Sequence, residues 1–145
     1  MEKVKAVITG AFAALSSWLG ILAVPVYILV ILNIADYGTG LVAAKYRGEK
    51  ISSDLGFRGI AKKVCMWLLI GLGSAVDWLL MFAAEQVHLD LHFSYFIGCF
   101  VAIWLICNEI LSILENVGDI GVPLPGFLKK IVEHLKSTVE EKGEE

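Results

Sequence analysis

The stretch ICNEILSILENVGDIGVPLPGF, residues 106–127, begins at the end of a long uncharged segment and changes character at once. Residues 93–107 carry no charged side chain. Five polar residues then follow in quick succession: Asn108, Glu109, Ser112, Glu115 and Asn116. A transmembrane helix needs about 20 mainly apolar residues. Residues 93–114 therefore predict a membrane-spanning helix that carries polar groups toward one end.

The composition of the whole chain indicates the same class of protein. Of the 145 residues, 57% are hydrophobic and 19% are charged, and the mean hydropathy is +0.74. Soluble domains contain about 45–50% apolar residues and about 25% charged ones, and a short soluble domain could not bury so much apolar surface. The composition therefore predicts an all-α integral membrane protein, with residues 1–145 forming a single membrane domain.

Two further segments are long and apolar enough to span a membrane. Residues 26–44 are followed directly by basic residues, and residues 64–84 are preceded by Lys62 and Lys63. Together with residues 93–114, they predict three transmembrane helices.

The N-terminal segment, residues 4–22, allows several interpretations. Lys5, Thr9, Ser16 and Gly20 form a polar stripe at helical spacing, and apolar residues cover the opposite side. Such an amphipathic helix can span the membrane, lie in the headgroup plane or line water inside an assembly. The pattern leaves these possibilities open.

A break and a short amphipathic helix are expected toward the C-terminus. Pro123 and Pro125 cannot continue a hydrogen-bonded helix. Residues 126–140 then combine apolar residues at helical spacing with Lys129 and Lys130 on the remaining face. We expect a cytoplasmic helix that lies on the membrane surface or against a partner.

The positions of lysine and arginine predict the orientation of the spans. Cytoplasmic loops of membrane proteins are enriched in these two residue types. Residues 45–63 form a basic loop, whereas residues 85–92 contain neither type. We therefore expect the basic loop and the C-terminus to be cytoplasmic. The basic residues of the loop are Lys45, Arg47, Lys50, Arg58, Lys62 and Lys63.

Three acids fall inside the predicted spans: Asp36, Asp77 and Glu109. Each acid costs about 2.5–3.5 kcal/mol on the insertion scale at the centre of a span. Small and polar residues recur near them at helical spacing, as is typical of helix–helix contacts in lipid. We expect these stripes to mark intramembrane packing or pore faces. The candidate residues are Asn33, Asp36, Thr39, Gly40, Asp77, Asn108, Glu109, Ser112 and Asn116.

The pattern leaves three roles open for the acids. They can hold helices together, either protonated or hydrogen-bonded to Asn33 and Asn108. They can contact water in an assembled state, or relay protons or ions. A rise of about 1.5 Å per residue places Asp36 and Glu109 at comparable depth, where they could meet, and Asp77 nearer the outer face.

The sequence contains no signature of catalysis or cofactor binding. Phosphate-binding GxxxxGK[ST] and GxGxxG motifs are missing, and no known catalytic triad can be assembled. His88 and His92 flank an acid at a spacing that suits a metal on a helix, but in a short loop this is a weak signal. The net charge of −3 predicts no nucleic-acid partner. We therefore expect neither an enzyme nor a cofactor or metal site.

Four stretches carry a resemblance to a known family. They are DYGTG at residues 36–40, ISSDLGFRGIAKK at residues 51–63, NEILSILEN at residues 108–116 and GVPLPGFLKK at residues 121–130. In this order, and with this predicted topology, the chain resembles the phage-lysis/toxin-secretion holin family. The resemblance covers about residues 31–136 and carries no matching motif in residues 1–25.

The resemblance implies a small protein of the bacterial cytoplasmic membrane that accumulates harmlessly and then self-assembles into lesions. Such lesions let an endolysin or a toxin without a signal peptide cross the membrane, leading to host cell lysis or toxin secretion. The implied partners are other copies of the chain, membrane lipids and the exported endolysin or toxin, with an antiholin as an optional partner. A second function stays open, a small proton- or ion-coupled transporter or channel, because intramembrane acids also occur in proton relays.

Overall fold

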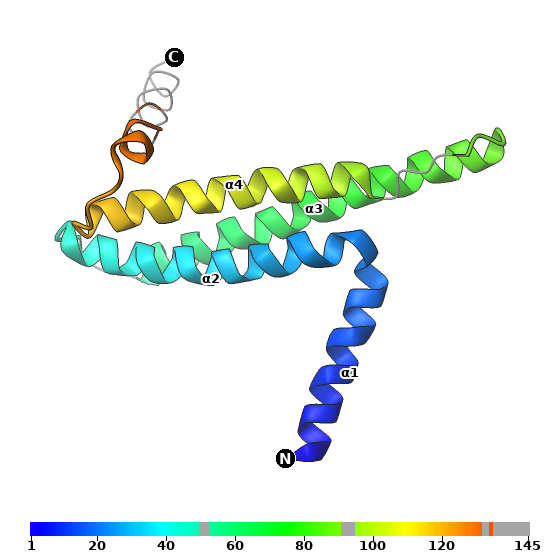
Figure 1. Ribbon diagram of the computed structural model, residues 1–145, viewed down its shortest axis with the longest axis horizontal. Helices are drawn as coiled ribbons and strands as arrows, with labels where there is room; N and C mark the ends of the chain where they lie inside the picture. The colour runs from blue at the N-terminus through cyan, green and yellow to red at the C-terminus, as the bar shows by residue number, and fades with distance from the viewer. Residues whose placement is uncertain (50–52, 91–94, 132–133, 135–145) are drawn as a thin grey trace. The chain divides into compact units, whose positions relative to one another are not determined.

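The computed structural model describes residues 1–49, 53–90, 95–131 and 134, apart from the side chains of residues 54 and 55. The prediction of an all-α protein is confirmed for these residues. The helices are α1 (Glu2–Leu19), the short 3-10 helix η1 (Gly20–Leu22), α2 (Ala23–Tyr46), α3 (Ser53–Gln86) and α4 (Phe96–Asp119) (Figure 1). Residues 126–131 are also helical.

Three helical stretches among the described residues are long and apolar enough to cross a membrane: Glu2–Tyr46, Gly56–Gln86 and Phe96–Asp119. α2 contains the predicted span 26–44, and α3 contains the predicted span 64–84. α4 covers the third span, 93–114, from residue 96 onward, and residues 93 and 94 lie outside the described residues. The prediction of three helices able to span a membrane is confirmed.

α3 begins well before its predicted span. It is a helix of 34 residues that starts at Ser53, so much of the predicted basic loop is helical. Arg58, Lys62 and Lys63 therefore lie on α3 rather than in a loop. Lysine and arginine are good helix formers, so hydropathy marks the lipid-embedded part of a helix but not its first residue. Lys45 lies in the last turn of α2, and Lys50 lies outside the described residues.

Two glycines end α2 and α4 in the same way. Gly48 has φ 74° and Gly121 has φ 97°, a left-handed conformation that glycine adopts without steric cost. The N–H groups of Gly48 and Glu49, and equally those of Gly121 and Val122, donate to carbonyl groups of the preceding turn. This Schellman arrangement satisfies carbonyls that would otherwise lack partners.

The chain leaves helical structure after α4, where the two prolines stand. Residues 122–125 are not helical, and helix resumes over residues 126–131. The break predicted at Pro123 and Pro125 is therefore confirmed. Lys129 and Lys130 are exposed on the following helix. Beyond residue 131 only residue 134 of the predicted helix 126–140 is described, so its surface position and cytoplasmic side stay predictions.

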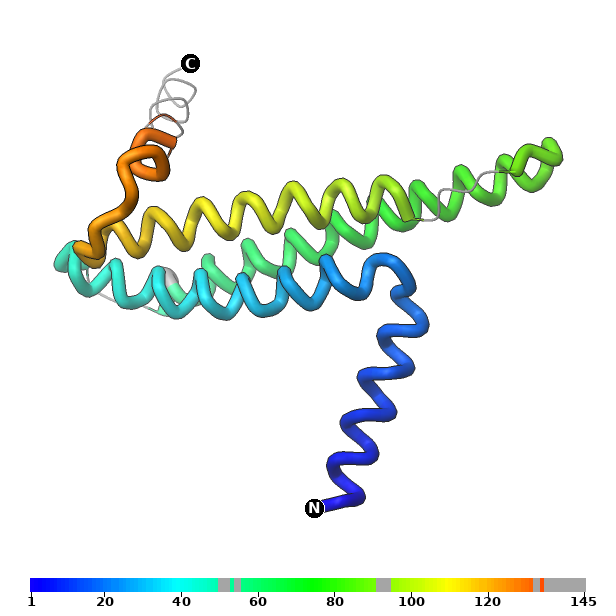
Figure 2. The backbone as a smooth tube through the Cα atoms, in the orientation of Figure 1, coloured from blue at the N-terminus to red at the C-terminus, as the bar shows by residue number. Residues whose placement is uncertain are grey.

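The N-terminal helix is joined to α2 through the tight turn of η1 (Figure 2). No residue is buried within α1, which is described in full. The ring of Tyr27 on α2 stacks on Phe12 with centroids 4.4 Å apart, and its hydroxyl lies 2.7 Å from Ser16 Oγ. Pro25 stands in the first turn of α2, where its missing N–H breaks no helical hydrogen bond.

The chain divides into two compact units, which are described separately. The first consists of Met1–Val30 and Lys63–Ile106, and we call it the Asp77 unit. The second consists of Ile31–Lys62 and Cys107–Glu145, and we call it the Asp36 unit. Each unit takes segments from α2, α3 and α4.

The core of the Asp77 unit is small and apolar. Trp67, Val101 and Ile106 pack around its fully buried members. Large apolar side chains point outward elsewhere, and Trp78 and Trp104 are each 62% exposed. Exposed apolar surface of this extent is typical of a membrane or partner contact. The buried core consists of Leu29, Met66, Ile70, Ala102 and Leu105.

Candidate functional site

The three acids within the spanning helices are all buried. The exposed fraction is 4% for Asp77, 9% for Asp36 and zero for Glu109. A polar group buried without a hydrogen bond costs folding free energy. The partners of these acids therefore decide what they can do.

Asp77 on α3 caps the first turn of α4. Its Oδ1 accepts a hydrogen bond from the N–H of Ile97 at 2.9 Å, and its Oδ2 accepts one from the N–H of Gly98 at 2.7 Å. The first N–H groups of a helix have no partners within the helix, and this end carries a partial positive charge. The carboxyl group supplies both missing acceptors, so Asp77 fixes where α4 begins.

Two glycines allow the close approach that this cap requires. A Cβ atom on Gly73 would lie 3.2 Å from the Cα of Gly98. A Cβ atom on Gly98 would lie 2.8 Å from Ser74 Oγ and 3.4 Å from Asp77 Oδ2. Small residues let helices in lipid approach one another closely. The Asp77 stripe is thus a contact between α3 and α4 in this unit.

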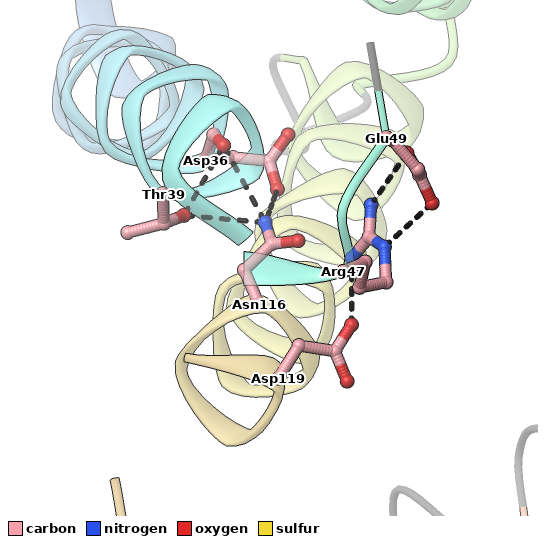
Figure 3. Close-up of polar contacts among 6 residues, drawn as sticks. All are labelled: Asp36, Thr39, Arg47, Glu49, Asn116 and Asp119. Carbon is pink, nitrogen blue, oxygen red and sulfur yellow. Dashed lines mark hydrogen bonds and ion pairs between the residues drawn. The ribbon is translucent and has the colours of Figure 1, made fainter. Parts of the chain in front are cut away.

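Asn116 links α4 to α2 in the Asp36 unit (Figure 3). Its Nδ2 lies 3.2 Å from Asp36 Oδ1 and 3.2 Å from Thr39 Oγ1. Thr39 Oγ1 in turn donates to the carbonyl oxygen of Ala35 at 2.9 Å. Gly40 leaves room for the amide, because a Cβ atom there would already lie 3.5 Å from Asn116 Nδ2. The structure therefore brings together four candidate residues from α2 and α4.

An ion-pair group lies just beyond α2, at the last turn of α4 (Figure 3). Arg47 donates to Glu49 at 2.7 and 3.3 Å and to Asp119 Oδ2 at 2.6 Å. The hydrogen bonds to Glu49 and to Asp119 raise the pKa of Arg47, and the hydrogen bond from Arg47 lowers the pKa of Glu49. Because all three side chains are partly exposed, solvent screening keeps their contribution to stability small.

Arg47 is one of the residues predicted for the basic loop, but neither of its partners, Glu49 and Asp119, was predicted. Asp119 stands three residues after Asn116, and residues three apart share a helix face. That spacing was a signal that could have extended the polar stripe of α4 by one more residue. Glu49 is positioned by the turn at Gly48, which the hydropathy pattern does not show.

A small pocket lies within the Asp36 unit, where α2, α3 and α4 contribute to its wall. Its volume is about 200 Å³. Ser112, a candidate residue that is half-buried, reaches this pocket together with Asp36 and Asn116. The other lining residues are Tyr37, Gly40, Leu41, Ala44, Arg47 and Gly59.

The remaining candidates lie on the same helices. Glu109 is fully buried and Asn108 is half-buried on α4. Asn33 is 8% exposed, and its Oδ1 accepts no hydrogen bond from the described residues. Leaving a buried acceptor unsatisfied costs about 1–3 kcal/mol. A donor from water or from another copy of the chain would relieve this cost.

The buried acids described above lie on three apolar helices. The model of the bacteriophage holin family matches residues 13–137. The chain belongs to this holin family. The match includes α2, α3 and α4 in full and the C-terminal part of α1. The resemblance stated from the sequence is confirmed.

Three relatives of this holin illustrate the range of similarity. An uncharacterized protein of Halalkalibacterium halodurans is 36% identical over 124 residues, covering 86% of this chain and 87% of the relative. An uncharacterized protein of Listeria monocytogenes is 35% identical over 107 residues, covering 74% of this chain and 68% of the relative. A probable holin of Bacillus phage phi105 is 26% identical over 117 residues, covering 81% of this chain and 78% of the relative. No solved structure matches the chain.

Proposed function

We propose that this holin assembles with copies of itself in the bacterial cytoplasmic membrane into lesions, through which an endolysin or a toxin without a signal peptide crosses. The observation that carries the proposal is a set of polar side chains on the apolar helices of a holin-family member. Asp36 and Glu109 are buried, and Thr39 and Asn116 are half-buried. Such groups are costly against lipid. They stabilise an open assembly when the helices exchange partners and these polar faces turn toward water.

The proposed opening follows from the energetics of these contacts. Before opening, Asp36 and Asn116 satisfy each other across α2 and α4, and Glu109 is shielded from lipid. In an assembly the same faces turn toward a water-filled lesion, where polar groups are hydrated and their cost falls. A membrane potential of 100 mV acts on one charge with only about 2.3 kcal/mol. A sharp trigger therefore requires several subunits that change together.

The topology is part of this proposal. The basic residues around the end of α2 and the start of α3 favour a cytoplasmic location for both. With three spans, we then expect a cytoplasmic C-terminus as well. α1 is a fourth spanning helix, an amphipathic helix at the surface, or a helix that lines water inside an assembly. Labelling of single cysteines at Lys5 and Ser16 from each side of the membrane distinguishes these topologies. The native Cys65 and Cys107 are exposed, so all three native cysteines must first be replaced.

The decisive experiment is expression in bacteria with and without a co-expressed muralytic enzyme. We expect growth to stop abruptly in both cultures, with lysis and release of cytoplasmic enzymes only when the muralytic enzyme is present. A small ion-coupled transporter, the alternative, would produce substrate-dependent flux without passage of protein. Intact cells and retained muralytic enzyme at full expression would contradict the proposal. Neither function includes a catalytic step.

A further inference from the structure

A pocket of about 630 Å³ lies where α3 ends, within the Asp77 unit. Trp78, Phe82 and Glu85 line it from α3, because residues three, four and seven positions apart share one face of a helix. The rings of Trp78 and Phe82 stack with their centroids 6.0 Å apart, and the two residues are 62% and 52% exposed. The pocket has the volume of a site for a small organic group, and one of its sides is an aromatic surface.

The turn after α3 forms the other side of this pocket. His88 has φ 55°, a left-handed conformation that ends the helix. The N–H of Leu89 then donates to the carbonyl oxygen of Ala84 at 2.9 Å. The chain therefore folds back on the end of α3, and His88 and Asp90 join the wall of the pocket.

Two carboxyl groups give the pocket a negative rim. Glu85 and Asp90 are both exposed, and neither makes a hydrogen bond or an ion pair with the described residues. No lysine or arginine lines the pocket, and His88 is the one basic side chain among the lining residues. Aromatic rings and carboxylates both attract cations. The pocket therefore suits a guest with a cationic group.

The polarity of the pocket changes along α3. Trp78 and Phe82 belong to the predicted span 64–84, whereas Glu85 is the first residue beyond it. At about 1.5 Å per residue, Trp78 lies about 10 Å deeper along the helix than Glu85. A matching guest has an apolar part beside the rings and a cationic group beside the acids. A lipid with an amino head group has this arrangement at the surface of a bilayer.

We propose that this pocket binds a membrane phospholipid whose head group carries a primary ammonium, as in phosphatidylethanolamine. Glu85 and Asp90 bind the ammonium, and the acyl chains pack along Trp78 and Phe82. His88, which lines the same pocket, has a ring N–H that can donate to the phosphate. The two carboxylates disfavour a purely anionic head group such as that of phosphatidylglycerol. The site requires only that α3 spans the membrane, and it does not depend on lesion formation.

The test compares two tryptophans of equal exposure by their quenching with brominated lipids. Trp78 and Trp104 are each 62% exposed within the Asp77 unit, but Trp104 lies in the uncharged segment 93–107. Two variants of the full-length holin each keep one of these tryptophans, and phenylalanine replaces the other three. Both are placed in phosphatidylethanolamine–phosphatidylglycerol vesicles of fixed composition, in which either one lipid or the other carries the bromine. The bilayer is thus the same in every comparison.

We expect bromine on phosphatidylethanolamine to quench Trp78 about threefold more effectively than bromine on phosphatidylglycerol, as suits an exposed cation–π contact. Trp104 should show no preference. Glu85→Gln combined with Asp90→Asn should abolish the preference at Trp78, and Phe82→Leu should weaken it. The substituted side chains are exposed, so these variants should keep their helix content, which circular dichroism measures. If a single-tryptophan variant fails to fold, the difference in quenching between wild type and Trp78→Phe gives the same comparison.

Equal quenching of Trp78 by the two brominated lipids in folded protein would overturn the proposal. A preference that survives the double substitution of Glu85 and Asp90 would overturn it as well. Soluble ethanolamine is added to the same vesicles as a competitor, and we expect it to leave the quenching unchanged. Loss of the preference in its presence would show that the pocket takes a free amine rather than a lipid. Because quenching requires no lesion, this result and the lysis experiment can fail separately.

Discussion

Asp77 and Asp36 are both buried acids on apolar helices, but their partners differ in kind. Asp77 accepts from two backbone N–H groups in the first turn of α4, whereas Asp36 accepts from the side-chain amide of Asn116. A backbone donor cannot leave without unwinding its helix, while a side-chain amide leaves by a change of rotamer. The hydrogen bonds of Asp77 therefore hold α3 and α4 together permanently, whereas the hydrogen bond between Asp36 and Asn116 can be exchanged for another.

The surroundings of the two acids extend this difference. Around Asp77, Gly73 and Gly98 approach so closely that a methyl group would not fit without a shift. Around Asp36 there is a pocket of about 200 Å³ and a partly exposed ion-pair group. Tight apolar packing resists rearrangement, whereas polar groups that already border open space can be rehydrated at low cost. The Asp36 unit is thus the part of the molecule suited to change.

The largest effect is expected from Asp77→Ala. The substitution leaves the N–H groups of Ile97 and Gly98 without their acceptors, at a cost of about 3 kcal/mol. Unfolding in a graded series of detergent mixtures measures this loss, and hydrogen exchange should show faster opening at residues 97 and 98. The stability of Asp77→Asn should fall between that of the wild type and that of Asp77→Ala, because asparagine keeps one acceptor oxygen. Glu85→Ala, an exposed acid on the same helix, is the control, and equal stability of all variants would contradict the cap.

Glu109→Gln should alter lysis timing rather than membrane insertion. Glutamine keeps the shape of the side chain but gains less from hydration than a carboxylate, so we expect an open assembly to be stabilised less and lysis to be delayed. A loss of about 1.4 kcal/mol in the activation step would slow it about tenfold. Timed lysis curves at equal membrane protein content provide the measurement. Glu115→Gln, half-buried on the same helix, is the control, and unchanged timing and lesion size would rule out this role for Glu109.

Asn116→Ala should have a smaller effect on stability than Asp77→Ala. It removes the amide that donates to Asp36 and Thr39, which costs about 1–2 kcal/mol. Water in the neighbouring pocket can replace the lost donor, and this limits the cost. The same detergent series measures the difference between the two variants. A loss as large as that of Asp77→Ala would mean that the two units are equally rigid.

The smallest effect is expected from Glu49→Gln, and it should depend on pH. Arg47 lowers the pKa of Glu49 below its ordinary value of 4.5 in the folded chain. The contribution to stability is therefore present above pH 4.5 and is lost as the pH falls through the lowered pKa. Thermal unfolding midpoints of wild type and Glu49→Gln should differ slightly at neutral pH and converge in acid. A difference that grows in acid would contradict this sign.

The sequence predicted the helices well because hydropathy and proline positions act locally. It predicted the break at Pro123 and Pro125 and the three helices that, among the described residues, can span a membrane. It did not predict that α3 begins at Ser53, since hydropathy does not register a charged helical extension. The role of Asp77 could not be predicted either, because a cap supplied by another helix depends on where α4 starts in space.

The pairing of Asp36 with Asn116 was predictable only in part. Both residues stood on polar stripes, but the stripes did not show which members would meet. The structure joins Asp36 to Asn116 and places Arg47 between Glu49 and Asp119. Such pairings depend on the register of one helix against another, which a single sequence does not encode locally.

The length of α3 has a consequence for how the protein is seated in its membrane. A helix of 34 residues is about 51 Å long, whereas the hydrocarbon layer is only about 30 Å thick. With residues 64–84 in the hydrocarbon layer, as predicted, we expect the surplus turns to bring Arg58, Lys62 and Lys63 to the phosphate layer, where a cation gains about 1 kcal/mol. Moving α3 deeper would transfer these cations into hydrocarbon, so we expect them to fix its depth in the bilayer. We therefore expect α2 and α4 to change their tilt or their helix contacts more readily than α3 changes its depth.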